Sequence, residues 1–527
     1  MPQQPDVVIV GAGSGGCVLA RRMLDAGLLV LLLEAGGRDT HPFIAPPAGF
    51  PRLFKSRVDW NFHTAPQANL NGRRLYWPRG KVLGGSSAIN ASIYIRGSQQ
   101  DFDGWEGTPG WGEGWAWKDV LPVYRALEKF RGEESETRSA GGLLHVGERA
   151  ASHALSHAFV QSAARALDIP VSNSFNDGLH LGAGLYESNH LRGVRQSAYK
   201  AFLAPVRHNP YLTVLTGAQM LTLLWEGGKV VGLQFAYQGR VKEVQAGGVV
   251  LAAGAVQTPQ LLMLSGIGPS RELEKHGIEV KLDSPGVGEG LQDHLAVPVI
   301  FKSTVPSLDA AKDLPALTEW LVRRTGPLSS NVAEAGAFAH ARPGLTRAEP
   351  PDLQYHFGPA YFREHGFQRE KGNHFSVGPV LVDTHSRGRI TLHSADPDAA
   401  PIIDPCYLSD ERDVQSLIAG IRLAREIAFG SPLAELNAGE VLPGIEAQSD
   451  AELLAHIRQD AETLYHPVGT AALGDSGQSV VDRRLKVRGA EGLWIADASV
   501  MPRIIHANTN ATAMMIGARA AGFLLEG

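Results

Sequence analysis

The sequence predicts an α/β protein in two parts: a Rossmann-like dinucleotide-binding domain and an α+β domain built on a mainly antiparallel sheet. Residues 6–34 read as a strand, a glycine turn, a helix and a second strand. Residues 295–450 carry more proline, histidine and charge, with alternating apolar segments that are typical of antiparallel strands. Residues 492–527 then return to the character of the first domain.

The glycine turn near the start of the chain is the most specific of these signals. Gly11 and Gly13 allow a tight turn and close approach of the backbone to a pyrophosphate, while Gly16 lets the helix pack on the sheet. The free N–H groups and the dipole of the helix favour an anion at its N-terminus. Glu34 follows Gly16 by 18 residues, close to the spacing at which an acid binds a ribose hydroxyl. A glycine-rich βα turn without a ligand is the alternative.

Composition limits what surrounds this turn. The chain has 527 residues, too many for one ordinary domain. Its 44% hydrophobic and 20% charged residues indicate a globular protein, and its net charge of -5 gives no basic excess that would favour nucleic acid. Cys17 and Cys406 are its two cysteines, which excludes a disulfide framework and a thiolate metal site. We therefore expect neither a nucleic-acid partner nor a metal.

The start of the chain and its apolar runs bear on location. The first residues have no positive n-region, and no nearby apolar run is long enough to span a bilayer. We expect a cytoplasmic protein without a transmembrane segment, and peripheral contact with a membrane stays open.

Further elements follow in order along the chain. Two stretches rich in glycine, proline and aromatic residues are expected to be loops, at residues 60–74 and 104–117. Residues 211–251 read as short strands joined by Gly-Gly turns. The remaining expected elements are antiparallel strands at residues 374–382 and 389–393, a strand at 493–496 and a helix at 511–525.

Two more glycine-bearing segments lie between these elements. In residues 80–103, the run from Gly84 to Ser87 can direct several N–H groups at one anion before an expected helix start at Asn90. In residues 254–268, Pro259 is expected to open a helix that ends at residues 265–268. Taken alone, either segment could equally be a structural loop.

Together these segments resemble the glucose-methanol-choline (GMC) flavoprotein oxidoreductase family, near its bacterial alcohol and choline dehydrogenase-like branch. The three glycine segments match family signatures in order, and residues 465–470 and 508–512 resemble its catalytic histidine and asparagine segments. The resemblance implies an α/β FAD-binding Rossmann-like domain and an α+β substrate domain. We place the discontinuous FAD-binding domain at residues 1–155, 190–296 and 456–527, and the substrate domain at 156–189 and 297–455.

Alcohol oxidation needs a base beside the flavin, because loss of the hydroxyl proton eases departure of hydride from the carbinol carbon. His466 is the candidate base, with hydride passing from a primary alcohol to flavin N5. Asn510 is expected to assist, holding the substrate oxygen through its amide at the start of a helix. A histidine before a proline can otherwise be a packed or capping residue.

The resemblance also assigns residues to FAD. At the pyrophosphate and the adenosine it places Gly11, Gly13, Ser14, Gly16, Glu34, Ala35 and Met220. Along the flavin, the ribityl chain and the diphosphate it places Trp60, Val82, Gly85, Asn90, Ala91, Ser92, Ile93, Tyr465, Asp497, Ala498 and Ala511. Asp497 could instead only cap a turn. Relatives with covalent FAD carry a histidine where this chain has Ile89, so noncovalent FAD is expected.

The substrate and the electron acceptor stay open at this point. Lys302, at the position to which we align a choline-binding glutamate, favours a neutral or even anionic alcohol over choline, although a choline dehydrogenase remains an alternative. Aromatic residues at 357–367 are either a substrate pocket or core. Oxygen, a quinone and a redox protein are all candidate acceptors.

Other classes of protein fit less well. An FAD-containing hydroxynitrile lyase of the same fold would use His466 for acid–base work alone, and a flavin-binding protein without activity is a further alternative. A nicotinamide dehydrogenase would not explain the second and third glycine segments. A serine hydrolase lacks its Gly-x-Ser-x-Gly elbow. His153 and His157 have helical spacing, but no glutamate accompanies them as in a zinc protease.

Overall fold

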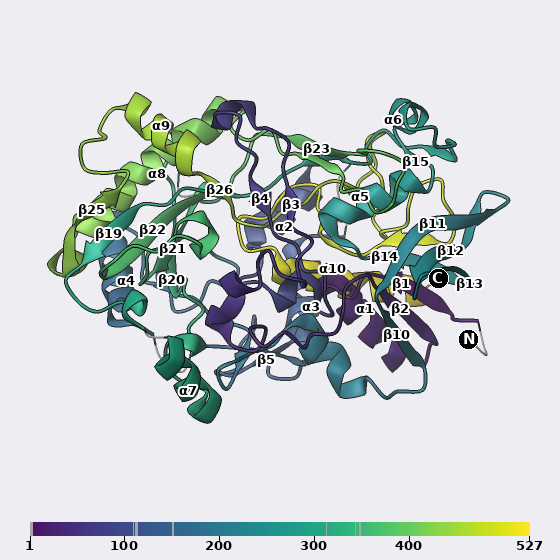
Figure 1. The fold of residues 1–527 in the computed structure, drawn as a ribbon, viewed down its shortest axis with the longest axis horizontal. Coiled ribbons are helices and arrows are strands. Elements are labelled where there is room, and N and C mark those ends of the chain that lie inside the picture. Colours follow the sequence, from purple (N-terminus) through teal and green to yellow (C-terminus); the bar gives the residue numbers. More distant parts are fainter. Residues whose placement is uncertain are drawn as a thin grey trace.

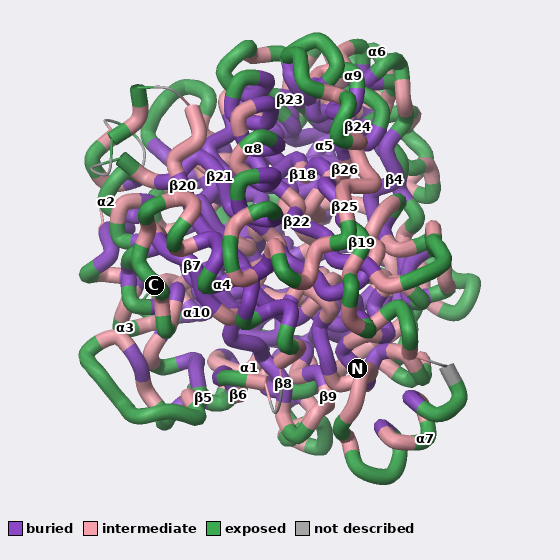
Figure 2. Tube along the Cα trace, turned by 90° about the vertical axis from the view of Figure 1, so that its left-hand side faces the viewer, coloured by how far each residue is buried: buried purple, intermediate pink, exposed green. Residues whose placement is uncertain are grey.

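The computed structural model describes residues 4–108, 110, 114–149, 152–311, 313–342, 344–346 and 349–526. Two sheets dominate this part of the chain. A five-stranded sheet lies at one end of the molecule, together with both chain termini, and an eight-stranded sheet lies at the other end (Figure 1). Buried residues fill the interior beneath exposed loops (Figure 2).

The five-stranded sheet is parallel throughout, with the order β10-β2-β1-β14-β27. Every residue of β1, β2 and β14 is buried, as expected for a parallel sheet covered on both faces. The strands are β1 (Val7–Val10), β2 (Val30–Glu34), β10 (Leu212–Thr216), β14 (Gly248–Leu251) and β27 (Leu493–Ile495). The predicted opening strands and the strand near residue 493 are confirmed.

Two helices from opposite ends of the chain pack together beside this sheet. They are α1 (Ser14–Asp25) and α10 (Asn510–Glu526). A Cβ on Gly517 would lie 2.3 Å from the Gly15 carbonyl oxygen, so only glycine permits this approach. The predicted C-terminal helix is confirmed, and it places the end of the chain against the glycine turn.

The predicted strands within residues 211–251 are also confirmed. After β10, the antiparallel strands β11 (Ala218–Glu226), β12 (Lys229–Tyr237) and β13 (Arg240–Gln245) form a three-stranded sheet before the chain returns through β14. Gly227 and Gly228 make the first turn with φ of 55° and 82°.

The eight-stranded sheet is antiparallel and forms the core of the second part. Its order is β25-β19-β22-β21-β20-β7, and β18 and β26 pair beside β22. The strands are β7 (Gly182–Leu185), β18 (Leu295–Ala296), β19 (Ile300–Ser303), β20 (Ala335–Ala339), β21 (Leu353–Gly358), β22 (His374–Leu381), β25 (Asn437–Leu442) and β26 (Glu462–Thr463). Helices α4 (Ala154–Ala166) and α8 (Glu411–Phe429) pack against this sheet. The domain limits drawn from the sequence stay a proposal.

The predicted strand at residues 389–393 occurs as β23 (Gly388–Thr391), in a separate antiparallel sheet with β17 (Glu289–Leu291) and β24 (Ile402–Asp404). The other short strands are β3 (Phe62–His63), β4 (Tyr76–Trp77), β5 (Glu128–Phe130), β6 (Leu144–Val146), β8 (His190–Leu191), β9 (Val194–Arg195), β15 (Ile267–Gly268) and β16 (Leu282–Asp283). The other helices are α2 (Gln99–Gly107), α3 (Trp117–Leu127), α5 (Gly254–Leu264), α6 (Ser270–Lys275), α7 (Asp313–Arg323) and α9 (Asp450–Asp460). Among the described residues, no helix combines the length and apolar character needed to cross a membrane.

The expected helix start at Asn90 is wrong. A short 3-10 turn at Gly85–Ala88 is followed by irregular backbone until α2 begins after the capping residue Ser98. The Asn90 side-chain oxygen accepts a hydrogen bond from the Ser92 N–H at 3.0 Å, and Ser92 has a φ of 58°. This local bond gives the backbone an alternative to the helix.

The expected start of α5 at Pro259 is also wrong, because the helix begins at Gly254. A proline inside a helix leaves the carbonyl four residues earlier without its N–H donor. That carbonyl belongs to Ala255, and the Thr470 hydroxyl donates to it at 2.7 Å. A side chain far along the chain therefore compensates for Pro259.

Of the two predicted loops, the first is confirmed and the second is shorter than predicted. Residues 60–74 contain only the two-residue β3 and a 3-10 turn at Ala68–Leu70, as expected of a loop. The loop at 104–117 is shorter than predicted, because α2 continues to Gly107; residues 109 and 111–113 of that prediction lie outside the described residues. His153 caps α4, with its Nδ1 accepting the Leu155 N–H at 3.2 Å, which gives it a structural role.

Candidate active site

A cavity of about 350 Å³ runs between the two sheets. Its wall includes the β1–α1 turn, residues 78–80, 85–86 and 89–93, the start of β11, the start of α5, parts of β21 and β22, and residues 462–467, 497–498 and 508–510. Segments from both ends of the chain therefore meet around one site.

The glycine turn forms the first wall of this cavity. Gly13 precedes α1 without a side-chain cap, so the first N–H groups of the helix stay free for a ligand. Gly11 has a φ of 103°, and a Cβ there would lie 2.4 Å from the Ala252 carbonyl oxygen. A Cβ on Gly85 would lie 2.7 Å from Gly13 Cα, so the first two glycine segments meet. This cradle suits a pyrophosphate.

Glu34 ends β2 and turns its carboxyl group toward the same wall. Its oxygens accept hydrogen bonds from the N–H groups of Ala12 at 3.0 Å and Gly36 at 2.8 Å. Burial raises the pKa of Glu34 to about 7, and these two hydrogen bonds oppose the shift. Ala35 and Met220 line the cavity beside it, as expected for the adenosine end.

Most of the predicted cofactor residues line the cavity. They are Gly11, Gly13, Ser14, Glu34, Ala35, Trp60, Gly85, Asn90, Ala91, Ser92, Ile93, Met220, Tyr465, Asp497 and Ala498. Gly16, Val82 and Ala511 do not line it. A Cβ on Gly16 would lie 2.0 Å from the Gly11 carbonyl oxygen, whereas Val82 and Ala511 are buried among apolar residues. Packing accounts for the positions of these three residues, and their contact with the cofactor stays a prediction.

Asp497 both caps a turn and lines the cavity. Its carboxylate accepts hydrogen bonds from the Ser499 N–H at 2.8 Å, the Gly254 N–H at 2.9 Å and the Thr258 hydroxyl at 2.6 Å. The end of β27 is thereby tied to the start of α5. The two interpretations offered by the sequence are compatible.

His466 lies in the wall at the opposite end, directly after β26. Its N–H donates to Asp293 Oδ1 at 2.7 Å, which fixes the backbone. Burial lowers the pKa of His466 well below its ordinary value, and nearby His294 adds to this shift. Both effects favour the neutral ring, which has a nitrogen that can accept a proton.

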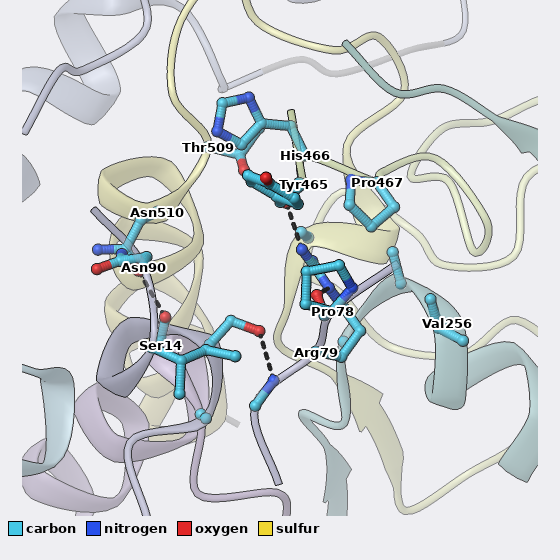
Figure 3. Close-up of a pocket in the computed structure, with 18 of the residues that line it drawn as sticks. Ser14, Pro78, Arg79, Asn90, Val256, Tyr465, His466, Pro467, Thr509 and Asn510 are labelled. Carbon is cyan, nitrogen blue, oxygen red and sulfur yellow. Dashed lines mark hydrogen bonds between the residues drawn. The ribbon is translucent and has the colours of Figure 1, made fainter. Parts of the chain in front are cut away.

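The amide expected beside His466 comes from a different asparagine. Asn508 Nδ2 lies 3.4 Å from His466 Nε2. The side chain of Asn510 instead accepts a hydrogen bond from the Ser14 hydroxyl at 2.6 Å and points across toward α1 (Figure 3). Asn510 is the first residue of α10, so its side chain faces the glycine turn. We correct the partner of His466 from Asn510 to Asn508.

Three residues that our assignment left out hold the His466 segment in place. Asp293 accepts hydrogen bonds from the His466 N–H and from the Thr463 and Tyr407 hydroxyls. His294 Nδ1 lies 2.9 Å from His466 Nδ1. Arg79 donates to the Tyr465 carbonyl at 2.6 Å (Figure 3). For Asp293 and His294, the signal in the sequence was the short polar run Gln292-Asp293-His294.

The wall near His466 is largely apolar. It includes Val297, Pro298, Val332, Phe362 and Val380. Titratable groups also line it, among them His356, whose pKa burial lowers to about 3, and Glu462, whose pKa burial raises to about 7. Such a wall suits a largely apolar substrate.

The structure bears on two expectations about the substrate pocket, and it corrects the one about Lys302. Of the aromatic residues in 357–367, Phe362 lines the cavity, while Phe357 is buried in the core of the antiparallel sheet. Lys302 lies exposed on β19 and does not line the cavity, so it gives no argument for or against choline.

The residues present fit FAD. The free helix end, the two close-packed glycine segments and the carboxyl group of Glu34 provide the anion and ribose contacts that a dinucleotide requires. Ile89 lines the cavity but carries no nucleophile, in agreement with noncovalent binding.

Comparison with known proteins agrees with this geometry. Models described as GMC oxidoreductase match residues 5–296 and 384–517. An alcohol dehydrogenase (acceptor) from Pseudomonas putida is 42% identical, over 99% of this chain and 96% of that protein. An oxygen-dependent choline dehydrogenase from Sinorhizobium medicae is 38% identical over 99% of this chain and 96% of its own.

A solved structure shows the same fold. The pyridoxine 4-oxidase from Mesorbium loti superposes with a TM-score of 0.91 at 31% identity, covering 99% of this chain and 100% of that one. The chain belongs to the GMC oxidoreductase family, as an FAD-dependent enzyme that oxidises CH–OH donors.

Proposed function

We propose that the enzyme oxidises neutral primary alcohols, with His466 as the base that takes the hydroxyl proton. The observation that carries this proposal is the position of His466 in an otherwise largely apolar wall, with its Nε2 3.4 Å from Asn508 Nδ2. Burial lowers the pKa of His466 and so favours its neutral form. A neutral imidazole has one nitrogen with a free lone pair. In a site that excludes water, this nitrogen is the group that accepts the hydroxyl proton as the alkoxide develops. FAD, when bound, accepts the hydride from the carbinol carbon.

Asn508 supplies the second polar contact in this proposal. Its side-chain nitrogen lies 3.4 Å from His466 Nε2, so an alcohol oxygen that reaches the base also lies within reach of this amide. An oriented amide stabilises the negative charge that develops on the oxygen without reorganisation of solvent. His466 and Asn508 thus replace the pair His466 and Asn510 that the sequence suggested.

Choline is the second candidate substrate, and two observations bear on it. A choline dehydrogenase is among the full-length relatives, and Glu462 places a carboxyl group in the wall. Burial raises the pKa of Glu462 to about 7, which weakens its charge as a partner for a quaternary ammonium group. We therefore rank neutral alcohols first.

The role of His466 is tested with His466→Gln and, as a matched control, with His157→Gln on the exposed side of α4. Both variants are expected to retain FAD. His466→Gln is expected to slow anaerobic flavin reduction by alcohol about 100- to 10,000-fold, because it removes the base. The control is expected to match the wild type. Equal reduction rates in the two variants would exclude His466 as the base.

A further inference from the structure

His466 shares a hydrogen bond with a second histidine outside the cavity wall. Nδ1 of His294 lies 2.9 Å from Nδ1 of His466, and the two ring planes are nearly perpendicular at 85°. His294 is completely buried and does not line the cavity. It lies between β17 and β18, one residue after Asp293, which accepts the backbone N–H of His466. Adjacent residues therefore hold both the backbone and the ring of His466.

Two neutral histidines can share only one proton between these nitrogens. If the proton lies on His466 Nδ1, His466 Nε2 carries the free lone pair; if it lies on His294 Nδ1, His466 Nε2 carries the proton and cannot act as a base. The Asn508 amide nitrogen approaches His466 Nε2 at 3.4 Å, which suits a lone pair there. The geometry thus favours donation from His466 Nδ1–H to His294 Nδ1.

The charged groups around the two rings keep His294 neutral and able to accept. Burial lowers the pKa of His294 to about 3, and neighbouring His506 lowers it further, while Asp101 opposes this and His356 adds to it. His506 is held as a cation between Asp101 and Asp383, with its pKa raised to about 9 despite burial. Protonation of His294 would place a second cation near that of His506, and repulsion between the two charges disfavours it.

The groups that face His466 act in the same direction. His356 and Arg79 disfavour its charged form, and His294 would do the same if it were itself a cation. A neutral acceptor at Nδ1 is the contact in this shell that stabilises the imidazolium formed when His466 takes a proton.

We propose that His294 is a positioning residue, which accepts the His466 Nδ1–H and thereby leaves Nε2 free as the base. This inference rests on the proposed role of His466. The proton from the alcohol goes to Nε2, and the Nδ1 proton stays in its bond to His294, so no proton leaves the pair during the step. The same logic applies wherever the partner of one imidazole nitrogen fixes the tautomer of the other.

The test compares His294→Asn with His294→Leu. The two replacement side chains have the same shape, but only asparagine places an acceptor oxygen near the position of the lost Nδ1. Anaerobic flavin reduction by an alcohol is measured for each holoenzyme across pH. We expect His294→Leu to lower kcat/KM about 10- to 100-fold, the effect of losing a hydrogen bond to a charged group.

The pH dependence separates this role from simple packing. Loss of the acceptor destabilises the imidazolium, so the acidic limb of kcat/KM is expected to move to lower pH in His294→Leu. His294→Asn is expected to restore most of the rate and the wild-type limb. Equal rates and limbs in the two variants, at equal FAD content, would overturn the proposal.

A second readout does not depend on turnover. A proton held between two buried imidazole nitrogens is protected from exchange and gives a far-downfield proton resonance. The buried bond between His506 Nδ1 and Asp101 gives a resonance of this kind in every variant. We expect one further resonance in the wild-type holoenzyme that is absent from His294→Leu and His466→Gln, and its presence in either variant would overturn the assignment. Failure of the proposed function is recognised separately, because His466→Gln would then leave flavin reduction unchanged.

Discussion

At the scale of single residues, the two asparagines that precede and open α10 have separate tasks. Asn508 faces His466, whereas Asn510 accepts a hydrogen bond from Ser14 at the start of α1. We expect Asn508→Leu to lower kcat/KM about 10- to 1,000-fold while FAD stays bound, because it removes an oriented dipole at the reacting oxygen.

Asn510→Leu is the matched control for this prediction. It removes the bond to Ser14, and we expect its main effect to be weaker FAD retention with smaller loss of rate per bound flavin. Flavin content and single-turnover reduction of both variants check the assignment. A larger rate loss per flavin in Asn510→Leu than in Asn508→Leu would reverse it.

Glu34 makes the stability of the flavin-free protein depend on pH. Its pKa is about 7 when folded, mainly because of burial, against 4.5 for the exposed group. A carboxyl group whose pKa is higher in the folded than in the unfolded protein stabilises the fold at pH values below its unfolded pKa. This stabilisation is lost as the pH rises toward its folded pKa. The loss amounts to about 3 kcal/mol between roughly pH 4.5 and pH 7.

Thermal unfolding of the flavin-free protein at these two pH values checks this prediction. We expect the wild-type midpoint to fall more on raising the pH than that of Glu34→Gln, whose side chain does not titrate. Other titrating groups are common to both proteins and cancel in the comparison. An identical fall in both would contradict the assignment to Glu34.

At the scale of elements, the contact between α1 and α10 depends on glycine at one position. A Cβ on Gly517 would lie 2.3 Å from the Gly15 carbonyl, while one on Gly522, later in the same helix, meets nothing within 4 Å. We expect Gly517→Ala to destabilise the protein by about 1–3 kcal/mol through overpacking. Gly522→Ala is expected to be neutral or stabilising by up to about 1 kcal/mol.

Thermal midpoints and flavin retention of the two variants check this expectation. Flavin retention is expected to fall with Gly517→Ala, because displacement of α1 moves the N–H groups of the glycine turn. If both variants behave alike, the close approach of the helices is not required.

Elements with a strong local signal were predictable from the sequence. Residues 6–34 have apolar strands, glycines and a helix in succession, and each element lies where expected. The errors at Asn90 and Pro259 share a cause. The Asn90 side chain binds the backbone of Ser92, and the Thr470 hydroxyl completes the helix around Pro259, so side-chain bonds decided both outcomes.

At the scale of the whole molecule, the site forms where the two sheets meet. His466 follows β26, which pairs with β18 of the antiparallel sheet, while Asn508 precedes α10, which packs on α1 beside the parallel sheet. The two residues are 42 apart in sequence, and only the fold brings them together. Family motifs could point to both segments, but they could not tell which asparagine faces the histidine.

The supporting residues illustrate the same limit. His294 and Asp293 reach His466 from 172 and 173 residues away. No local pattern reports a contact at that separation. The cofactor cradle was easier to predict, because the glycines within each of its two segments lie close together in the sequence.

The most direct test is the visible spectrum of the purified protein under anaerobic addition of benzylic, furanic and aliphatic primary alcohols and of choline. We predict flavin absorption that bleaches with a neutral primary alcohol and more slowly with choline, and readmission of air then tests oxygen as the electron acceptor. Absence of flavin after reconstitution, or bound flavin that no alcohol in the set bleaches, would contradict the account.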